Sequence, residues 1–169
     1  HIYIYMKYVV AGSTGLIGKN LIKTISKENE VIALTRRNFN FADGVFEKIV
    51  DFDNEYDLPK ADHLFICLGF PVELLDLVIM RKSTKTLFHK VDYEYVCNLA
   101  FKAKNSGIEN VSVVSAVGAS KYSINYYLKT KGLMEEQLKK LNFHTLNIFQ
   151  PSHLLGEREK PIGHDVKPV

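Results

Sequence analysis

Short apolar segments alternate along the chain with longer segments whose apolar residues recur at helical spacing. The short segments are rich in β-branched residues and apolar throughout, which is typical of strands covered on both faces of a sheet. Strands that alternate with helices form βαβ units with right-handed crossovers, so the pattern predicts a parallel sheet. The six predicted strands are Lys7–Ala11, Val31–Thr35, Val45–Val50, His63–Leu68, Val111–Ser115 and Thr145–Phe149.

Segments of helical periodicity separate these strands. One follows the first strand and runs to about residue 25, one covers about residues 91–103 before Asn105-Ser106-Gly107, and one spans about residues 124–141. We therefore expect an α/β fold, a Rossmann-like doubly wound parallel sheet with helices on both faces, in a single domain over residues 6–155.

Three segments fall outside this alternation. The apolar run Leu74–Met80 has two interpretations, a buried helix that caps the sheet or an exposed surface for a partner, and we expect the buried helix. The polar segment 156–169 contains two prolines and is predicted to be a loop or a truncated tail. Residues 1–5 precede Met6-Lys7, which would make a natural start, and are expected to be an upstream or artificial extension.

Composition narrows the function classes. The chain has 169 residues, which suits one compact domain, and its net charge of +3 is too small to indicate nucleic acid or an anionic membrane as a partner. Cys67 and Cys97 lie too far apart to indicate a metal knuckle or a redox pair, and the histidines share no metal-ligand spacing. We therefore expect a cytoplasmic protein that binds a small molecule, with no metal, nucleic acid or membrane.

Three glycines follow the first predicted strand at spacings of three. Glycine permits a tight turn, lets the backbone approach a pyrophosphate, and lets a helix pack on a strand without an intervening Cβ. The helix that begins near Gly15 would direct its free N–H groups at the phosphates. Because the glycines end a strand and open a helix, they predict a dinucleotide site. The expected cofactor contacts are Gly12, Ser13, Thr14, Gly15, Leu16, Ile17 and Gly18.

Two arginines, Arg36 and Arg37, follow the second predicted strand. NAD-selective proteins carry an acidic residue about 20 positions beyond the glycines, where it accepts the ribose 2′-hydroxyl. A guanidinium there can instead pair with a 2′-phosphate and stack on the adenine. The sequence therefore predicts NADP(H) in preference to NAD(H); the alternative is two solvated arginines at a strand end.

A candidate active site combines Ser115, Tyr127 and Lys131. Tyr127 and Lys131 are four residues apart on a predicted helix and share a face. A nearby ammonium favours the phenolate, so Tyr127 could serve as general acid or base for a carbonyl–alcohol interconversion. Lys131 could also donate to the nicotinamide ribose, and Ser115, at a strand end, could donate to the substrate oxygen.

Together, the glycine turn, Ser115 and Tyr127-x-x-x-Lys131 resemble the short-chain dehydrogenase/reductase superfamily. Further segments, between about Met6 and Arg158, resemble its small atypical members, the Tat-interacting-protein-like oxidoreductases. The resemblance implies a Rossmann-like fold, NADP(H) binding and a Ser–Tyr–Lys site. It also places Asp51 near the adenine, and Leu68 and Gly69 along the cofactor. The matching segments are Val31–Arg37, Cys67–Gly69, Val91–Val96, Val114–Ala119 and Asn125–Glu135.

The chain departs from this family on the substrate side. Ser115-Ala116 stands where the family usually has two serines, and Gln150-Pro151 where it tends to have Arg-Pro. After Pro151 only 18 residues follow, whereas family members generally continue into a further helical segment. These departures bear on turnover more than on cofactor binding.

The first hypothesis is an NADP(H)-dependent oxidoreductase that acts on a small carbonyl or alcohol. One alternative is a nucleotide-sugar epimerase or dehydratase, which uses the same constellation of residues. The other is a non-catalytic NADP(H)-binding regulatory or scaffold protein. Homodimers are common in the family, so a homodimer stands as an alternative to a monomer.

Overall fold

A computed structural model describes residues 5–73 and 75–152 of the chain. Its centre is a six-stranded sheet in the order β3-β2-β1-β4-β5-β6, and every neighbouring pair of strands is parallel. This is the Rossmann-like fold expected from the sequence. The strands are β1 (Lys7–Ala11), β2 (Glu30–Thr35), β3 (Val45–Ile49), β4 (His63–Ile66), β5 (Asn110–Val114) and β6 (Thr145–Phe149).

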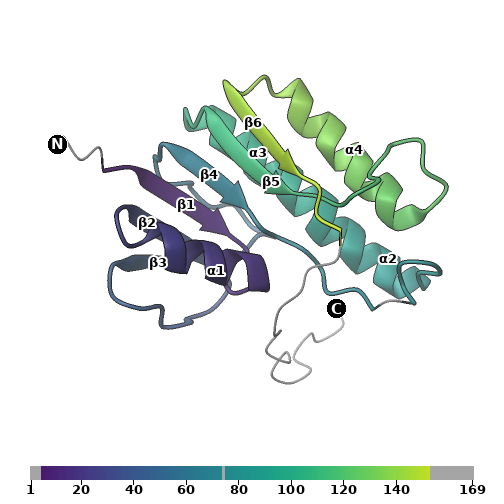
Figure 1. The fold of residues 1–169 in the computed structure, drawn as a ribbon, viewed down its shortest axis with the longest axis horizontal. Helices are drawn as coiled ribbons and strands as arrows, with labels where there is room; N and C mark the ends of the chain where they lie inside the picture. The colour runs from purple at the N-terminus through teal and green to yellow at the C-terminus, as the bar shows by residue number, and fades with distance from the viewer. Residues whose placement is uncertain (1–4, 74, 153–169) are drawn as a thin grey trace.

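The helices cover both faces of the sheet (Figure 1). The helix that follows the glycine turn lies on one face, and the helices that precede β5 and β6 lie on the other. The helices are α1 (Leu16–Ile25), α2 (Lys82–His89), the π-helix η1 (Lys90–Tyr95), α3 (Val96–Asn105) and α4 (Tyr126–Lys140).

The sheet separates two apolar cores, because successive residues of a strand point to opposite faces. Val10 packs with Ile22 of α1 on one face. Val9 belongs to the larger core on the other face, together with Leu99 of α3 and Leu138 of α4. The two cores hold α1 and α4 at fixed positions against the strands, and these helices carry the candidate cofactor and active-site residues.

The helices differ from the expected ones in two segments. The run Leu74–Met80 was expected to be a buried helix, but residues 75–79 form turns, and Leu75, Val78 and Ile79 are 77–79% exposed, although Met80 is buried. Leu74 lies outside the described residues. The polar segment Lys82–His89, for which no helix was predicted, forms α2. It continues without a break through η1 into α3, and its buried Phe88 anchors it against the ring of Tyr127.

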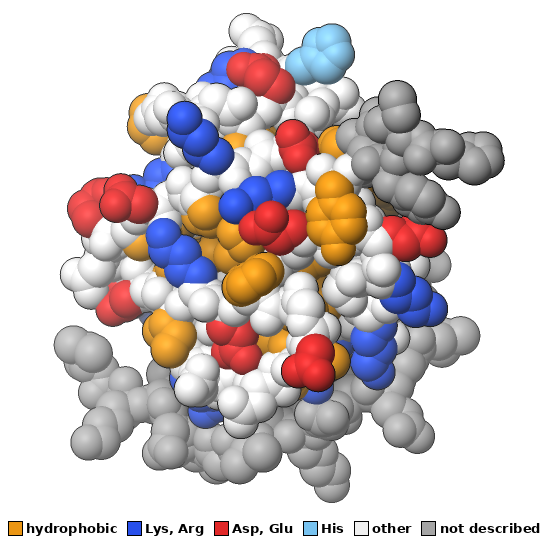
Figure 2. Space-filling view, turned by 90° about the vertical axis from the view of Figure 1, so that its left-hand side faces the viewer, with side chains coloured by type: hydrophobic (Ala, Val, Ile, Leu, Met, Phe, Trp, Pro, Cys, Tyr) orange, Lys and Arg blue, Asp and Glu red, His pale blue; other side chains and the backbone are white. Residues whose placement is uncertain are grey.

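The surface carries charges of both signs. On the face seen in Figure 2, acidic and basic side chains are interspersed around hydrophobic ones. Neither sign forms a continuous field there, in keeping with the small net charge of +3. Within the described part of the chain, no helix has both the length and the apolar character to cross a bilayer.

Candidate cofactor site and active site

The glycine turn after β1 is packed too closely for side chains. Gly12 has φ +75°, and a Cβ there would overlap the carbonyl of Cys67 and lie 2.7 Å from the backbone nitrogen of Leu68. A Cβ on Gly18 would overlap the carbonyl of Gly12. The turn is closed by a hydrogen bond from the Gly15 N–H to the Gly12 carbonyl, at 3.1 Å. These contacts make a cradle whose floor is backbone alone.

Helix α1 begins directly on this turn. Its N-cap, Gly15, has an extended backbone and makes no side-chain capping bond, and the first turn contains no acidic residue. Free N–H groups at a helix start, together with the helix dipole, favour an anionic ligand. The cradle and the helix start therefore fit a pyrophosphate, and Gly12, Thr14, Gly15, Leu16, Ile17 and Gly18 are the residues that would surround it.

Ser13 has a different part in the turn. Its side chain is buried, and its hydroxyl donates to the carbonyl of Leu34 on β2 at 2.9 Å. The hydroxyl proton is thus committed to the protein. Any donation from Ser13 to a phosphate would come from its backbone N–H.

The end of β2 carries a second feature that fits a bound nucleotide. Within residues 5–73 and 75–152, the hydroxyl of Thr35 is the one buried side-chain polar atom that lacks a hydrogen-bond partner. Such a group costs free energy unless a ligand or other partner satisfies it. Arg36 and Arg37, which follow it, are both exposed. One buried hydroxyl and two free guanidinium groups therefore stand at the end of the strand where the adenosine ribose was expected.

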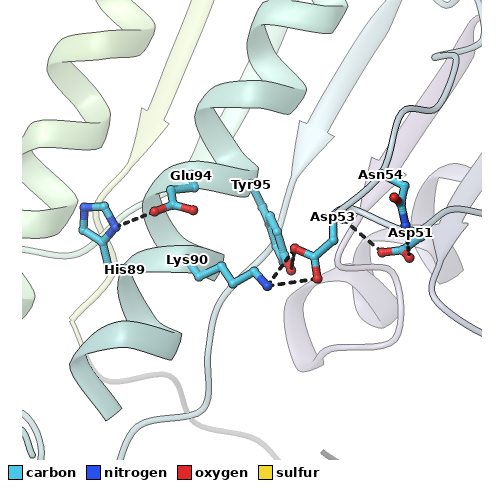
Figure 3. Close-up of polar contacts among 7 residues, drawn as sticks. All are labelled: Asp51, Asp53, Asn54, His89, Lys90, Glu94 and Tyr95. Atoms are coloured by element: carbon cyan, nitrogen blue, oxygen red, sulfur yellow. Dashed lines mark hydrogen bonds and ion pairs between the residues drawn. The ribbon is translucent and has the colours of Figure 1, made fainter. Parts of the chain in front are cut away.

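The loop after β3 is tied to the π-helix (Figure 3). The carboxylate of Asp53 pairs with Lys90 at 2.7 Å and accepts from the Tyr95 hydroxyl at 2.7 Å. These hydrogen bonds, that of Lys90 above all, lower the pKa of Asp53. Asp51 instead accepts from Asn54 at 2.7 Å and from the Asp53 backbone at 3.0 Å. The loop that carries Asp51 and Asp53 is thus partly held against η1, and a contact of Asp51 with adenine stays a prediction.

Helix α4 is capped at its N-terminus by a side chain and packs closely against the loop that follows β5. The Asn125 side chain accepts from the Leu128 N–H at 3.0 Å and donates to the Leu77 carbonyl at 2.5 Å. A Cβ on Gly132 would overlap the backbone of Ser120, so the loop after β5 lies directly on the helix. This packing fixes α4 at the second turn, where Lys131 lies.

The three predicted active-site residues come from adjoining elements. Ser115 directly follows β5, and Tyr127 and Lys131 lie one turn apart on α4. The ring of Tyr127 stacks on Phe88 of α2, with ring centroids 5.0 Å apart. Tyr127 is half-buried, whereas Ser115 and Lys131 are each 4% exposed.

Ser115 is held by a buried carboxylate that the sequence analysis missed. Its hydroxyl donates to Glu135 of α4 at 2.5 Å, and the Gln150 amide donates to the same oxygen at 2.8 Å. A hydroxyl has a single proton, so further hydrogen bonds at Ser115 Oγ are ones that it accepts. Because its hydroxyl donates to Glu135, Ser115 Oγ is placed in this structure to accept a hydrogen bond, whereas the sequence analysis predicted that it donates to the substrate oxygen.

Lys131 is likewise held by a carboxylate that was missed as a site residue. Its ammonium lies 2.6 Å from Asp92 Oδ1, and the second oxygen of Asp92 accepts from the Phe70 N–H at 2.7 Å. Both missed carboxylates, Glu135 beside Ser115 and Asp92 beside Lys131, could have been noticed in the sequence. Glu135 is four residues after Lys131, and Asp92 falls within an apolar helical segment, where a charge must find a partner.

The loop after β4 joins the two halves of the site. Leu68 contacts the glycine turn through its backbone nitrogen, and Gly69 lies against Asp92, whose Oδ1 would be 3.7 Å from a Cβ there. Leu68 and Gly69 thus stand between the candidate phosphate cradle and Lys131, and contact of these two residues with a cofactor stays a prediction.

An apolar cavity of about 550 Å³ opens on the α1 side of β4, β5 and β6. Its walls come from Ile17 and Leu21 of α1, Val114 beside Ser115, and Phe149 and Gln150 at the end of β6. Its size suits a small organic molecule. The cavity meets the active-site region through Gln150, which is bonded to Glu135.

Among the described residues, the cysteines are weak nucleophiles and the histidines form no metal site. Burial raises the pKa of Cys67 and of Cys97 to about 12, so both remain thiols at neutral pH and are weak nucleophiles. Both are free cysteines. Within the part of the chain that the structure describes, no group of three His, Cys, Asp or Glu side chains could hold a metal ion. His153 lies outside the described residues.

Replacement of Glu135 by alanine is expected to destabilise the fold by about 2–3 kcal/mol, because the buried Ser115 hydroxyl and the amide of the more exposed Gln150 lose a charged acceptor. Glu136→Ala is the matched control, since Glu136 pairs only with the surface residues Lys121 and Lys139. Urea unfolding curves of both variants measure the difference. Equal losses of stability would show that the Ser115–Glu135 bond contributes nothing beyond a surface ion pair.

Comparison with known proteins gives a consistent relationship. The profile of the NAD dependent epimerase/dehydratase family matches residues 8–138. Protein HTATIP2 of Rattus norvegicus is 31% identical over 162 residues, which cover 89% of this chain and 64% of that protein. The mitochondrial protein FMP52 of Candida glabrata is 32% identical over 167 residues, which cover 94% of this chain and 69% of that protein.

Solved structures with this fold are also longer. UDP-glucose 4-epimerase of Thermotoga maritima, solved with UDP-glucose, superposes with a TM-score of 0.75 at 16% identity, over 94% of this chain and 59% of that one. UDP-glucuronic acid 4-epimerase of Bacillus cereus, in complex with NAD, superposes with a TM-score of 0.70 at 16% identity, over 92% and 59%. The chain therefore spans about two thirds of its curated relatives and somewhat less of these enzymes.

Proposed function

Because this chain belongs to the NAD dependent epimerase/dehydratase family, and within it to the Tat-interacting-protein-like group of HTATIP2 and FMP52, we propose that it is an NADP(H)-dependent oxidoreductase. The reaction is NADPH plus a small carbonyl compound plus a proton, giving NADP⁺ and the alcohol, or its reverse. The observation that carries the proposal is the backbone cradle at Gly12 and Gly18. The loop after β4 packs against this cradle and is connected to Lys131 through Asp92.

The nucleotide would lie along the carboxyl ends of the strands. The glycine turn and the start of α1 would hold the pyrophosphate, Thr35 and Arg36 the adenosine ribose and its 2′-phosphate, and Leu68 and Gly69 the route toward Lys131. The bound nicotinamide supplies the hydride, and the protein supplies position and proton transfer.

Proton transfer falls to Tyr127 in this proposal. Its hydroxyl would give a proton to the substrate oxygen during reduction and take it back during oxidation. Lys131 has three N–H donors, of which one goes to Asp92, so the others can serve the nicotinamide ribose and Tyr127. Ser115, whose proton goes to Glu135, would accept a hydrogen bond from a substrate alcohol or from the Tyr127 hydroxyl.

Titration of the chain with NADPH and with NADH, followed by the cofactor's fluorescence, tests the cofactor part of the proposal. We expect NADPH to bind at least tenfold more tightly, because a bidentate arginine–phosphate pair is lost with NADH. Arg36→Glu should reverse the preference. Arg81→Glu, at an exposed arginine just before α2, should leave it unchanged. Equal affinities for the two cofactors, unaffected by Arg36→Glu, would contradict the proposal.

A second candidate, an NADP(H)-binding regulatory or scaffold protein, is favoured by the exposed apolar side chains of Leu75, Val78 and Ile79. NADPH oxidation with a panel of aldehydes, ketones and quinones separates the two candidates. Because an epimerase consumes no cofactor overall, the epimerase alternative needs a separate assay, in which conversion of UDP-glucose to its 4-epimer is followed by chromatography. Tight NADPH binding without turnover of any compound would favour the regulatory protein.

Partners and cellular location remain predictions. The substrate is expected to be a small molecule, with neither nucleic acid nor membrane as a partner, and a homodimer is an alternative to a monomer. The FMP52 relatives carry the word mitochondrial in their names, so the cytoplasmic location expected from the sequence needs its own test.

A further inference from the structure

Asp92 and Lys131 form an ion pair that is almost completely removed from solvent. Their side chains are 2% and 5% exposed, and the ammonium lies 2.6 Å from Asp92 Oδ1. Asp92 comes from the first turn of the π-helix η1, and Lys131 from the second turn of α4. The pair therefore joins the two helices that flank the candidate active site.

A pair of this kind is a poor way to gain stability. Burial raises the pKa of Asp92, and the charge of Lys131 and the Phe70 N–H only partly oppose that effect. Two apolar side chains of similar volume often stabilise a fold as well as a buried ion pair does. A role in positioning therefore accounts better for the two charges. π-turns are also frequent at functional sites.

Asp92 is also the middle of a continuous set of contacts. Its Oδ2 accepts from the Phe70 N–H at 2.7 Å. The residues just before Phe70 form the wall of the glycine turn, where Cys67 and Leu68 leave no space for a Cβ on Gly12. The contacts therefore run from the phosphate cradle through the loop after β4 to Asp92, and from Asp92 to Lys131.

We propose that Asp92 is a positioning residue that couples the two ends of the site: it fixes the Lys131 ammonium and ties it to the loop that walls the glycine turn. Cofactor seated on the turn would hold residues 67–70, and through Asp92 these residues would hold Lys131 beside the nicotinamide ribose and Tyr127. The role of Lys131 in catalysis rests on the proposed function, whereas the link from Asp92 to the cofactor cradle does not.

The chain contains a natural control for this proposal. Asp53 and Lys90 form a second Asp–Lys pair that also involves η1, at 2.7 Å, but their side chains are 50% and 39% exposed (Figure 3). That pair closes the loop after β3, and within residues 5–73 and 75–152 its hydrogen bonds reach neither the glycine turn nor α4. Replacement of Asp53 should therefore remove an Asp–Lys ion pair and leave the connection between the glycine turn and Lys131 intact.

The test compares Asp92→Asn with Asp53→Asn. Lys131 and the Phe70 N–H bond to different oxygens of Asp92, whereas asparagine places an oxygen at one of these positions and an NH2 donor at the other, so it cannot keep both bonds in this geometry. We expect Asp92→Asn to raise the Kd for NADPH about tenfold and to lower kcat at least tenfold, with the KM for the carbonyl substrate changed less than threefold. Asp53→Asn should stay within twofold in all three quantities.

A double-mutant cycle with Lys131→Met shows whether Asp92 acts through Lys131. If Asp92→Asn alone folds poorly, the double variant serves in its place, because Lys131→Met removes the ammonium that Asp92→Asn leaves unpaired. Under the proposal, Asp92→Asn lowers kcat no further once Lys131 is methionine. Two results would overturn the proposal: losses of kcat that add in the double variant, or a Kd of Asp92→Asn for NADPH that stays within twofold of the value for the unmodified chain. If the unmodified chain turns over no substrate, the proposed reaction fails, and the NADPH Kd alone then decides the role of Asp92.

Discussion

Tyr127→Phe is expected to lower kcat for carbonyl reduction by two to four orders of magnitude, because the phenol is the proposed proton donor to the substrate oxygen. The phenyl ring retains the stacking on Phe88, whose centroid lies 5.0 Å away, so α4 and its contacts should persist. The Kd for NADPH should therefore change less than about twofold. Steady-state turnover and cofactor titration on the same preparation measure both effects.

Tyr126→Phe is the matched control for that substitution. Tyr126 is the adjacent residue on α4, its ring lies 6.5 Å from that of Phe88, and Lys85 sits over its face at 5.0 Å. Removal of its hydroxyl leaves these ring contacts in place, so turnover should stay within about threefold. If Tyr127→Phe kept more than a tenth of the turnover, another group would be the proton donor.

Gly12→Ala is expected to cost about 2–5 kcal/mol of folding stability and to abolish detectable cofactor binding. The added methyl group would overlap the Cys67 carbonyl, and the residue would be forced to keep φ +75°. Overpacking a fixed backbone costs roughly 1–3 kcal/mol, and a left-handed alanine roughly 1–2 kcal/mol more. Movement of the Cys67–Leu68 wall would in turn distort the phosphate cradle.

Gly44→Ala separates the two causes. Gly44 has φ +88°, but nothing lies within 4 Å of a Cβ at that position. It therefore carries the backbone strain without the collision, and the expected loss is about 1–2 kcal/mol with cofactor binding intact. Urea unfolding and NADPH titration of the two variants give the comparison. Similar losses of stability and retained binding in both would mean that the close packing at Gly12 is unimportant.

The sequence predicted the sheet well because each strand carries its own signal. The four inner strands are largely apolar, as strands buried on both faces are, and the edge strands β3 and β6 are partly exposed. All six observed strands agree with the predicted ones to within about two residues at either end. The helix α2 had no such signal, since Phe88 is its one fully buried side chain and the rest of Lys82–His89 is largely polar. Its helical state depends on packing against α4 and on continuation into η1, and both are tertiary effects.

The site was predicted in part for the same reason. The glycine spacing and the Tyr127–Lys131 spacing are local, so they could be recognised in the sequence. The partners of Ser115 and Lys131 are 20 and 39 positions away, and only the folded chain brings them together. The sequence therefore predicted a donor role for Ser115 without showing that its hydroxyl donates to Glu135. The unpaired hydroxyl of Thr35 also depends on burial, which the sequence does not display.

The central claim is that the glycine turn holds a dinucleotide whose other end reaches Lys131. Backbone amide NMR during an NADPH titration tests it most directly, because every residue of the turn reports separately. We predict saturable shifts confined to residues 12–18, 35–37 and 67–70 and to the first two turns of α4. Saturating NADPH that left the amides of Gly15 and Gly18 unshifted, or shifted only residues outside these segments, would contradict the account.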